Sequence, residues 1–155
     1  MYTSLQTFKN TFLVNNNINK VWEFYTDIKH LKMITPKEIN LQVINVTEQK
    51  FSQGTEIWIE GKILISKRKA WHSVITFLKP YEYVDEMLSG PFKKWRHLHK
   101  FHDLDHGQKT EVADQVYFEL PYGVLGKLFE GYAYNQLRKI FDYRKIATIK
   151  NLETL

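Results

Sequence analysis

The sequence predicts an α+β domain in which a curved antiparallel sheet of about seven strands wraps around a long C-terminal helix. Hydrophobic residues alternate with polar ones at a period of two through most of residues 40–119, as in half-buried strands. Apolar residues recur at helical spacing after Pro121, and the connections between the alternating segments are short and polar. Short connections favour antiparallel neighbours, and a sheet with one apolar face needs a helix to cover it.

The length and composition are those of one folded domain spanning residues 1–155. The chain is 43% hydrophobic and 15% aromatic, which is too much for a disordered protein. It contains no cysteine, which excludes a disulfide framework and a thiolate site. No apolar stretch approaches the ~20 residues of a membrane-spanning helix, and the start, MYTSLQTFKN, lacks the apolar region of a signal peptide. We therefore expect a cytoplasmic protein without a transmembrane segment.

The first elements are a strand followed by two short helices. Residues 4–14 predict the strand, and residues 15–36 predict a helical stretch. Asn17 can cap the start of this stretch, because its side chain can accept a hydrogen bond from the first helical turn, and Pro36 closes it. A second short helix is expected around residues 30–34.

Six further strands and a terminal helix complete the chain. The strands are predicted at residues 40–46, 54–66, 69–78, 81–89, 95–102 and 110–119. Residues 124–155 predict one long helix. Its expected apolar stripe consists of Val124, Leu128, Tyr132, Leu137, Phe141 and Ile146. A strongly twisted sheet that curls around this stripe need not close completely, so an apolar cavity can remain between sheet and helix.

A net charge of +5 raises the question of a polyanionic partner. Basic residues gather at residues 67–69 and again at Lys93, Lys94 and Arg96, where strand ends or turns are expected. No nucleic-acid recognition motif accompanies them, so nucleic acid is not the expected partner. The second group, together with Lys100, supports a third hypothesis of contact with a membrane surface or nucleic acid, which added salt should weaken steeply.

Four of the six histidines lie within GPFKKWRHLHKFHDLDHG, residues 90–107, and alternation along a strand divides them. One face carries Trp95, His97, His99 and Phe101. The other face carries Arg96, Leu98, Lys100 and His102, while His106 falls in the following turn. Because both large aromatic residues share a face with His97 and His99, we expect these two histidines to point inward.

Two aspartates are expected beside the inward histidines. A simple register across the turn DLDHGQ sets His99 opposite Asp114. Across the turn GPFKK, the expected register sets His99 opposite Asp85 and His97 opposite Met87. A slip of two residues would exchange these pairs without changing the face. The expected inward cluster is Asp85, His97, His99 and Asp114, surrounded by Trp71, Trp95, Phe101 and the terminal helix.

Three roles are open to this cluster. Its two imidazoles and two carboxylates could bind zinc or non-haem iron, but the spacing fixes no further ligand, so no metal is expected. A histidine held by an aspartate could transfer a proton to or from a bound ligand. The groups could also hydrogen-bond only to one another and orient a ligand. Residues 103–114 imitate a calcium-binding loop, but Gln108 stands where that loop requires glycine, which excludes calcium.

A set of segments, taken in this order, resembles a known superfamily. They are VWEFYTDIKHLKMITP (21–36), Gly54, KAWHSVI (69–75), GPFKKWRHLHKF (90–101), DQVYFELPYGVLG (114–126) and IFDYRK (140–145). Together they resemble a subgroup of the START-like superfamily, also called SRPBCC, which includes polyketide cyclase/dehydrase-like and lipid-transport proteins. The resemblance covers nearly the whole chain. It implies the helix-grip fold with a deep cavity between sheet and helix, where members bind hydrophobic or amphipathic molecules and some are enzymes.

The expected function is therefore binding of a small hydrophobic or amphipathic molecule, of the lipid, polyketide, quinone or aromatic class. Aromatic walls would supply most of the affinity. These walls are Trp71, Trp95, Phe101 and Tyr132. The cluster of Asp85, His97, His99 and Asp114 would orient a polar end, and no cofactor is expected. The entrance is expected beside residues 18–34 and the loops near Gly90 and Gly123.

The alternative is a cyclase- or dehydrase-type enzyme that uses His99 with Asp114 as a proton-transfer pair in the same cavity. The sequence leaves the oligomeric state and the identity of the ligand open.

Overall fold

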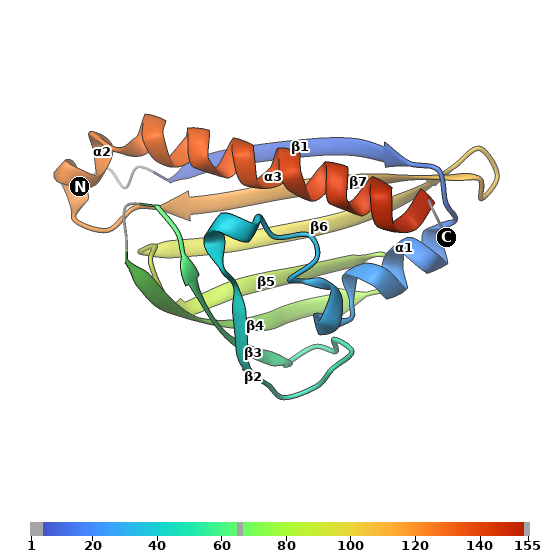
Figure 1. Cartoon of the computed structure of the whole chain (residues 1–155), viewed down its shortest axis with the longest axis horizontal. Coiled ribbons are helices and arrows are strands. Elements are labelled where there is room, and N and C mark those ends of the chain that lie inside the picture. The colour runs from blue at the N-terminus through green and yellow to red at the C-terminus, as the bar shows by residue number, and fades with distance from the viewer. Residues whose placement is uncertain (1–4, 65–66, 154–155) are drawn as a thin grey trace.

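A computed structural model describes residues 5–64 and 67–153 of the chain, which form one curved antiparallel sheet and the helices packed against it (Figure 1). The strands are β1 (Gln6–Val14), β2 (Gln42–Val46), β3 (Glu56–Lys62), β4 (Arg68–Lys79), β5 (Glu82–Ser89), β6 (Lys94–Leu104) and β7 (Lys109–Glu119). The helices are α1 (Ile18–Tyr25), the 3₁₀ turns η1 (Ile28–His30) and η2 (Lys37–Ile39), α2 (Gly123–Lys127) and α3 (Glu130–Glu153). The predicted α+β class and the seven-stranded sheet on a C-terminal helix are confirmed.

The sheet has the strand order β1-β7-β6-β5-β4-β3-β2. Strands β2 to β7 form the predicted meander, and the first strand returns to pair with the last, with Phe8 opposite Val116 and Phe12 opposite Val112. Helix α3 lies across the face formed by β1, β7 and β6, while α1 and the turns after it cover the same face farther along (Figure 1). All the helices therefore lie on the concave side, and the core is the layer between them and the sheet.

The first helix begins as expected but ends sooner. The Asn17 side chain accepts a hydrogen bond from the Lys20 N–H at 3.0 Å, which confirms the predicted cap. Helix α1 ends at Tyr25, since the next residues turn to the loop that precedes β3, where the Ile28 N–H donates to the Gln49 carbonyl at 2.9 Å. The helical stretch to residue 36 was therefore too long. The second helix is a single 3₁₀ turn at Ile28–His30, followed by turns rather than an α-helix at 30–34.

The strand predicted at residues 54–66 is shorter in the structure. β3 covers Glu56–Lys62 and is followed by Leu64, whose φ of 56° is incompatible with an extended strand. Residues 65 and 66 lie outside the described residues, as does residue 4 of the first predicted strand.

The predicted terminal helix is divided into two helices, α2 and α3. The apolar stripe predicted for it was wrong in part. Residues 128 and 129 form a turn that separates α2 from α3. Leu137 and Phe141 are buried, but Val124, Leu128 and Ile146 are 80%, 78% and 67% exposed. The buried residues of α3 are Ala133, Leu137, Phe141, Ala147, Thr148 and Leu152. The break shifts the phase of the helix, and small residues let α3 approach the sheet, so a stripe drawn from large residues alone misses the true face.

Candidate functional site

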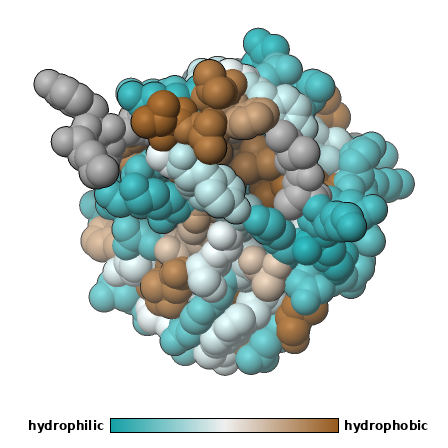
Figure 2. Space-filling model, turned by 90° about the vertical axis from the view of Figure 1, so that its left-hand side faces the viewer, coloured by the Kyte–Doolittle hydropathy of each residue, from teal (hydrophilic) through white to brown (hydrophobic). Residues whose placement is uncertain are grey.

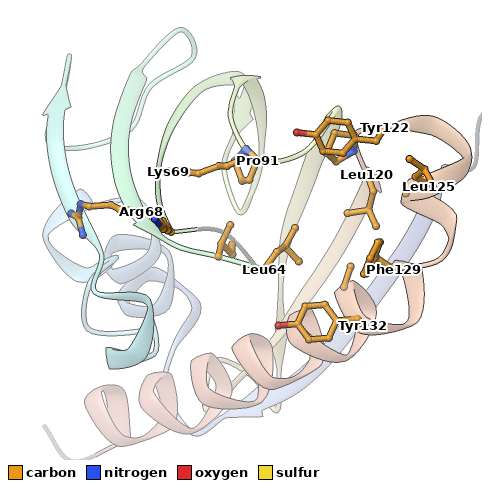
Figure 3. A pocket seen from close by; sticks show the side chains of 14 residues that line it. Leu64, Arg68, Lys69, Pro91, Leu120, Tyr122, Leu125, Phe129 and Tyr132 are labelled. Carbon is orange, nitrogen blue, oxygen red and sulfur yellow. The ribbon is translucent and has the colours of Figure 1, made fainter.

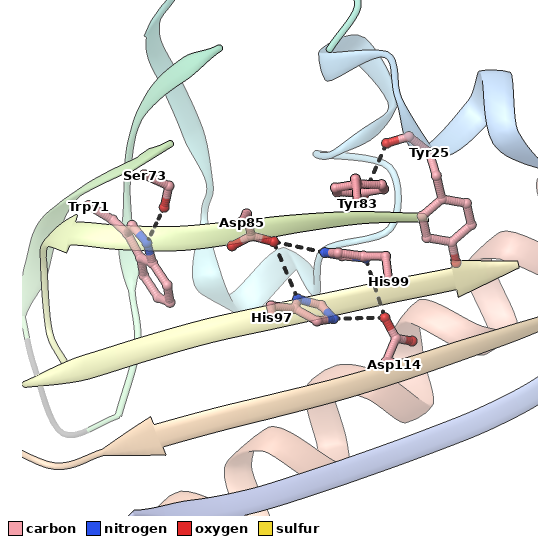
Figure 4. A network of polar contacts seen from close by, with 8 residues as sticks. All are labelled: Tyr25, Trp71, Ser73, Tyr83, Asp85, His97, His99 and Asp114. Atoms are coloured by element: carbon pink, nitrogen blue, oxygen red, sulfur yellow. Dashed lines mark hydrogen bonds and ion pairs between the residues drawn. The ribbon is translucent and has the colours of Figure 1, made fainter. Parts of the chain in front are cut away.

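The inward cluster lies on three neighbouring strands of the concave face. Asp85 comes from β5, His97 and His99 from β6, and Asp114 from β7 (Figure 4). Alternation along the strands explains the common face, because His97 and His99 are two residues apart and their cross-strand partners point the same way. Both histidines and Asp114 are buried, while the Asp85 side chain is 20% exposed.

The register between β6 and β7 is the predicted one, and the register between β5 and β6 is the two-residue slip. His99 lies opposite Asp114, as expected. Asp85 lies opposite His97 rather than His99, and Tyr83 occupies the place opposite His99. The pairing of β5 with β6 stops at Glu86, and the wide connection that follows buries the ring of Phe92 against Trp71, Trp95 and Phe118. A tight turn at GPFKK was therefore the wrong assumption.

The short hydrogen bonds of the cluster run diagonally between the strands. His97 Nε2 lies 2.8 Å from Asp114 Oδ1, and His99 Nε2 lies 2.8 Å from Asp85 Oδ2 (Figure 4). The other ring nitrogens lie farther from the opposite carboxylates, His97 Nδ1 at 3.6 Å from Asp85 Oδ2 and His99 Nδ1 at 3.5 Å from Asp114 Oδ1. The imidazole centroids are 3.6 Å apart. Each imidazole thus lies between both carboxylates.

Two polar atoms of the cluster are buried without a hydrogen-bond partner among the described residues. They are His99 Nδ1 and Asp114 Oδ2. Leaving a buried polar group unpaired costs about 1–3 kcal/mol, so such groups are concentrated where a protein needs them for something other than stability. The unpaired atoms indicate that this cluster is more than a set of satisfied core residues.

The protonation states of the cluster differ from those of the same groups in water. Burial, helped by the charge of His97, lowers the pKa of His99 well below its usual value, so this ring is neutral at pH 7. Burial also raises the pKa of Asp85, against the opposing charges of His97 and Arg144. Burial alone would raise the pKa of Asp114, but the hydrogen bond from His97 and the nearby positive charges outweigh it and lower this pKa. Asp114 therefore carries the fixed negative charge, and Asp85 is the carboxyl that takes up a proton more readily.

The sequence interpretation missed Arg144, a half-buried residue of α3 that faces the cluster. Its guanidinium carbon lies 5.3 Å from the centroid of the Tyr25 ring, which leaves the charge over an aromatic face. Its Nε is buried without a hydrogen-bond partner among the residues that the structure describes. The available signal was its position, three residues after Phe141 and four before Thr148, which places a cation on the buried face of the helix.

Two tyrosines also border the cluster and were not singled out from the sequence. The Tyr83 ring stacks on His99 with centroids 4.0 Å apart and an interplanar angle of 11°. The Tyr25 hydroxyl lies 2.7 Å from Thr148 Oγ1 on α3, and burial raises the pKa of Tyr25 to about 12. Tyr83 precedes Asp85 by two residues on the same strand, so face alternation was the signal that could have found it.

Three hollows with shared lining residues lie between this cluster and the end of the molecule at α2. The innermost, about 150 Å³, is bordered by Asp85, both histidines and Arg144. A second, about 110 Å³, shares with it the lining residues Leu31, Ile59, Trp71, Trp95, His97 and Arg144. A third, about 460 Å³, shares Ile63, Lys69 and Pro91 with the second and opens at the end of the molecule where α2 lies (Figure 3). Each of these hollows therefore shares part of its wall with the next.

The outer pocket is lined mostly by apolar side chains. Among them are Leu64, Pro91, Leu120, Leu125 and Phe129, with Arg68 and Lys69 at one side (Figure 3). Hydrophobic side chains also gather on the outside of this end, above a hollow with hydrophobic walls (Figure 2). Leu125 is 65% exposed and Phe129 49% exposed. Exposed apolar rims of this kind mark places where a protein receives an apolar partner or ligand.

The four expected aromatic walls have different positions. Trp71 and Trp95 border the two inner hollows together with the cluster. Tyr132 borders only the outer pocket among these hollows. Phe101 lies apart from all three and packs in the core against Trp22 and Tyr25, with ring centroids 5.7 and 5.1 Å apart.

Asp114 does not border the inner hollow. Its side chain is fully buried behind the histidines and contacts His97 and His99 rather than the open space. Its side chain therefore reaches the hollow through the two imidazoles, and its charge also acts on Arg144.

One group among the described residues could hold a metal ion. Asp85, His97 and His99 each offer a ligand atom, and these atoms lie within 4.8 Å of one another. Two imidazoles and one carboxylate are the donor set that zinc and iron(II) accept.

The basic residues of the third hypothesis are largely matched by acidic neighbours. Lys93 and Lys94 lie 2.7 and 3.8 Å from the Glu119 carboxylate. Arg96 pairs with Glu86 at 3.6 Å, and Lys100 lies 3.8 Å from Glu82. This surface is a mixed-charge strip rather than a basic patch. Within the described part of the chain, no helix is both long enough and apolar enough to cross a membrane.

Comparison with known proteins finds similar folds among solved structures. No family model matches the chain, and no curated protein matches it. Among solved structures, TTHA0849 from Thermus thermophilus is 13% identical with a TM-score of 0.76, covering 96% of this chain and 98% of that one. A START superfamily protein from Mycobacterium smegmatis is 11% identical with a TM-score of 0.71, covering 96% and 97%. A norcoclaurine synthase point mutant from Thalictrum, in complex with a transition-state analogue, is 10% identical with a TM-score of 0.71, covering 97% and 98%.

These similarities extend over nearly the full length of each chain and agree with the strand order and the long terminal helix described above. The chain has the helix-grip fold, which it shares with a structure described as a START superfamily protein.

Proposed function

We propose that this protein binds a small hydrophobic or amphipathic molecule, of the lipid, polyketide, quinone or aromatic class, between the sheet and α3. The observation that carries the proposal is the set of adjoining hollows, one lined mostly by apolar side chains and another bordered by the buried polar cluster. The similar solved structures support it, since one is described as a START superfamily protein and another as a synthase bound to a transition-state analogue.

The dimensions of the hollows favour an elongated ligand. The outer pocket, at about 460 Å³, falls within the range of roughly 300–1,000 Å³ that is typical of small-molecule sites. The innermost hollow, at about 150 Å³, has room for a small ring or a polar end group rather than a whole ligand. Apolar surface buried in the outer pocket would contribute roughly 25 cal/mol per Å² to binding.

The cluster favours a neutral polar end group over a fully charged one. The negative charge of Asp114 is already opposed by the positive charge of Arg144 nearby. A charged organic end group that the cluster's side chains do not coordinate directly would disturb that balance in a buried site, where an unpaired charge is costly. A hydroxyl or carbonyl group needs only one donor or acceptor, and Asp85 and Arg144 border the hollow and supply both.

Tryptophan fluorescence tests the proposal, because Trp71 borders both inner hollows. Titration with menadione, a small quinone, should quench the emission in a saturable manner. Trp71→Phe should remove part of the quenching, since Trp95 also borders both hollows. Trp58→Phe is the matched control, since Trp58 stacks on His72 outside these hollows. Quenching that is linear in menadione, or equal in the two variants, would count against binding in the cavity.

A second candidate is an enzyme of the cyclase or dehydrase kind, and one observation favours it. Asp85 borders the hollow, hydrogen-bonds to His99 and has a raised pKa, which is the combination that a general acid needs. The proton-transfer pair would then be His99 with Asp85, rather than His99 with Asp114. Asp85→Asn should abolish turnover of a bound substrate while leaving its dissociation constant within about threefold, whereas an equal loss of both would speak for binding alone.

A further inference from the structure

We propose that Asp85, His97 and His99 bind a divalent first-row transition metal ion such as Zn²⁺ or Fe²⁺, with Asp114 positioning the two imidazoles. Sequence patterns alone provide no reason to expect a metal, because HxH on a strand fixes only two ligands. The structure supplies the third ligand from the neighbouring strand and a carboxylate behind the histidines.

The three residues bring potential ligand atoms close together. Asp85 Oδ2 lies 2.8 Å from His99 Nε2 and 3.6 Å from His97 Nδ1, and the three residues each offer a ligand atom within 4.8 Å of the others. Atoms that share a metal ion at about 2.0–2.2 Å stand roughly 3.0–3.5 Å apart in tetrahedral or octahedral geometry. The observed distances lie on both sides of this value, so small side-chain rotations without movement of the strands complete the site.

Asp114 stands where a metal site needs its outer carboxylate. Its Oδ1 is 2.8 Å from His97 Nε2 and 3.5 Å from His99 Nδ1, so the nitrogens that do not face Asp85 both face one oxygen. A carboxylate that accepts the N–H of a ligating histidine fixes the tautomer and turns the other nitrogen toward the metal. One aspartate does this here for two histidines.

The unpaired nitrogen of His99 is compatible with a metal ion bound at the other nitrogen of the same ring. When His99 Nε2 donates to Asp85, its Nδ1 has no proton and stays buried without a partner. When Nε2 binds a metal instead, Nδ1 carries the proton and can donate to Asp114. The metal-bound arrangement therefore gives this atom a partner, as a protonated Asp85 that donates to His99 Nε2 also would.

The surroundings hold the ligands firmly and leave coordination positions free. Tyr83 stacks on His99, and the Phe141 ring packs on His97 with centroids 5.4 Å apart. The inner hollow of about 150 Å³ borders all three ligands and has room for a water molecule or a ligand oxygen on the metal. The metal site lies in the wall of the proposed ligand cavity but does not depend on an organic ligand being bound.

Cobalt(II) tests the site directly, because its visible spectrum reports coordination by histidine and carboxylate. Protein without a histidine tag should bind one Co²⁺ per chain with a saturable visible band, and one equivalent of Zn²⁺ should remove the band. Asp85→Asn, His97→Ala and His99→Ala should each weaken binding about 100-fold or more, and Asp114→Asn should weaken it by about 10- to 100-fold. Circular dichroism establishes that each variant is folded, and Asp85→Asn changes the shape least.

His102→Ala is the matched control, since His102 lies on the opposite face of the same strand and is exposed. It should leave the spectrum and the stoichiometry unchanged. The proposal is overturned if the folded wild-type protein takes up no stoichiometric Co²⁺, or if Asp85→Asn binds as well as wild type. It is equally overturned if His102→Ala removes the binding. Menadione quenching measured on metal-free protein tests the organic ligand separately, so either proposal can fail alone.

Discussion

His99 hydrogen-bonds to Asp85 on the adjacent strand, and not to Asp114, which lies directly opposite it in the register. The same diagonal arrangement joins His97 to Asp114. The two carboxylates therefore have different positions and different roles. Asp114 is enclosed and holds both rings from behind, whereas Asp85 borders the hollow and is the carboxyl that a ligand or a metal ion can reach.

Because the two carboxylates differ in position, removing their charges should change the free energy of unfolding by unequal amounts. Asp114→Asn should lower the free energy of unfolding by about 3 kcal/mol, because it removes the buried negative charge that opposes Arg144 and lies 2.8 Å from His97 Nε2. Asp85→Asn should cost about 1 kcal/mol, since burial already disfavours the charge of Asp85. Urea denaturation of the metal-free protein at pH 7 measures both. Equal losses would contradict the assignment of Asp114 as the enclosed carboxylate.

The buried face of α3 gives a second prediction. Phe141 is 2% exposed and packs against Phe8 and His97, so Phe141→Ala should lower the free energy of unfolding by about 3–5 kcal/mol. Ile146 is 67% exposed, and Ile146→Ala should change it by less than about 0.5 kcal/mol. Thermal or urea unfolding of the two variants measures both changes. A large loss of stability in Ile146→Ala would show that Ile146 belongs to the buried face, as the sequence led us to expect.

Acid stability depends in part on Glu119, at the end of β7. The hydrogen bond from Lys93 lowers the pKa of Glu119, so the unfolded chain takes up a proton at this residue more readily than the folded chain does. Its contribution to stability is therefore present above the unfolded value of about 4.3 and is lost as the pH falls through the folded value. Glu119→Gln should flatten the decline in stability between about pH 5 and pH 3, while Glu23→Gln, on the exposed side of α1, should not. Parallel declines in wild type and Glu119→Gln would show that this pair contributes nothing.

The mouth of the cavity can be tested with two neighbouring residues. Phe129 borders the outer pocket, and Leu128 beside it is 78% exposed and does not border it. Phe129→Glu should weaken binding of an apolar ligand roughly tenfold, because it places a charge in the apolar entrance. Leu128→Glu adds the same charge outside the pocket and should leave the affinity unchanged. If both substitutions weaken binding equally, the ligand does not enter here.

The sequence was sufficient for the fold and for the face of the cluster, because both follow from periodicity. The register between β6 and β7 was predictable since residues 105–107 turn tightly, all with positive φ. The register between β5 and β6 was not, because the buried ring of Phe92 widens the connection and nothing local in the sequence requires that. A contact made across the fold decided the pairing.

The diagonal hydrogen bonds and the role of Arg144 could not be predicted from the sequence either, because both depend on the tertiary structure. Register gives which residues face each other, but side-chain rotation decides which oxygen each imidazole meets. The phase of α3 relative to the sheet depends on the break after α2, so the charge on its buried face became visible only in the folded chain. Local patterns predicted the elements, and the tertiary structure determined the chemistry.

Native mass spectrometry of the untagged protein, incubated with palmitate, cholesterol, menadione or flavone, tests the central claim most directly. The account predicts a 1:1 complex with at least one of these ligands, retained by Leu128→Glu and lost or much reduced in Phe129→Glu. Denaturing extraction of the protein as purified identifies any organic molecule that it already carries. An apo mass with all four ligands and an empty extract, or a complex that Phe129→Glu retains in full, would contradict a ligand site between the sheet and α3.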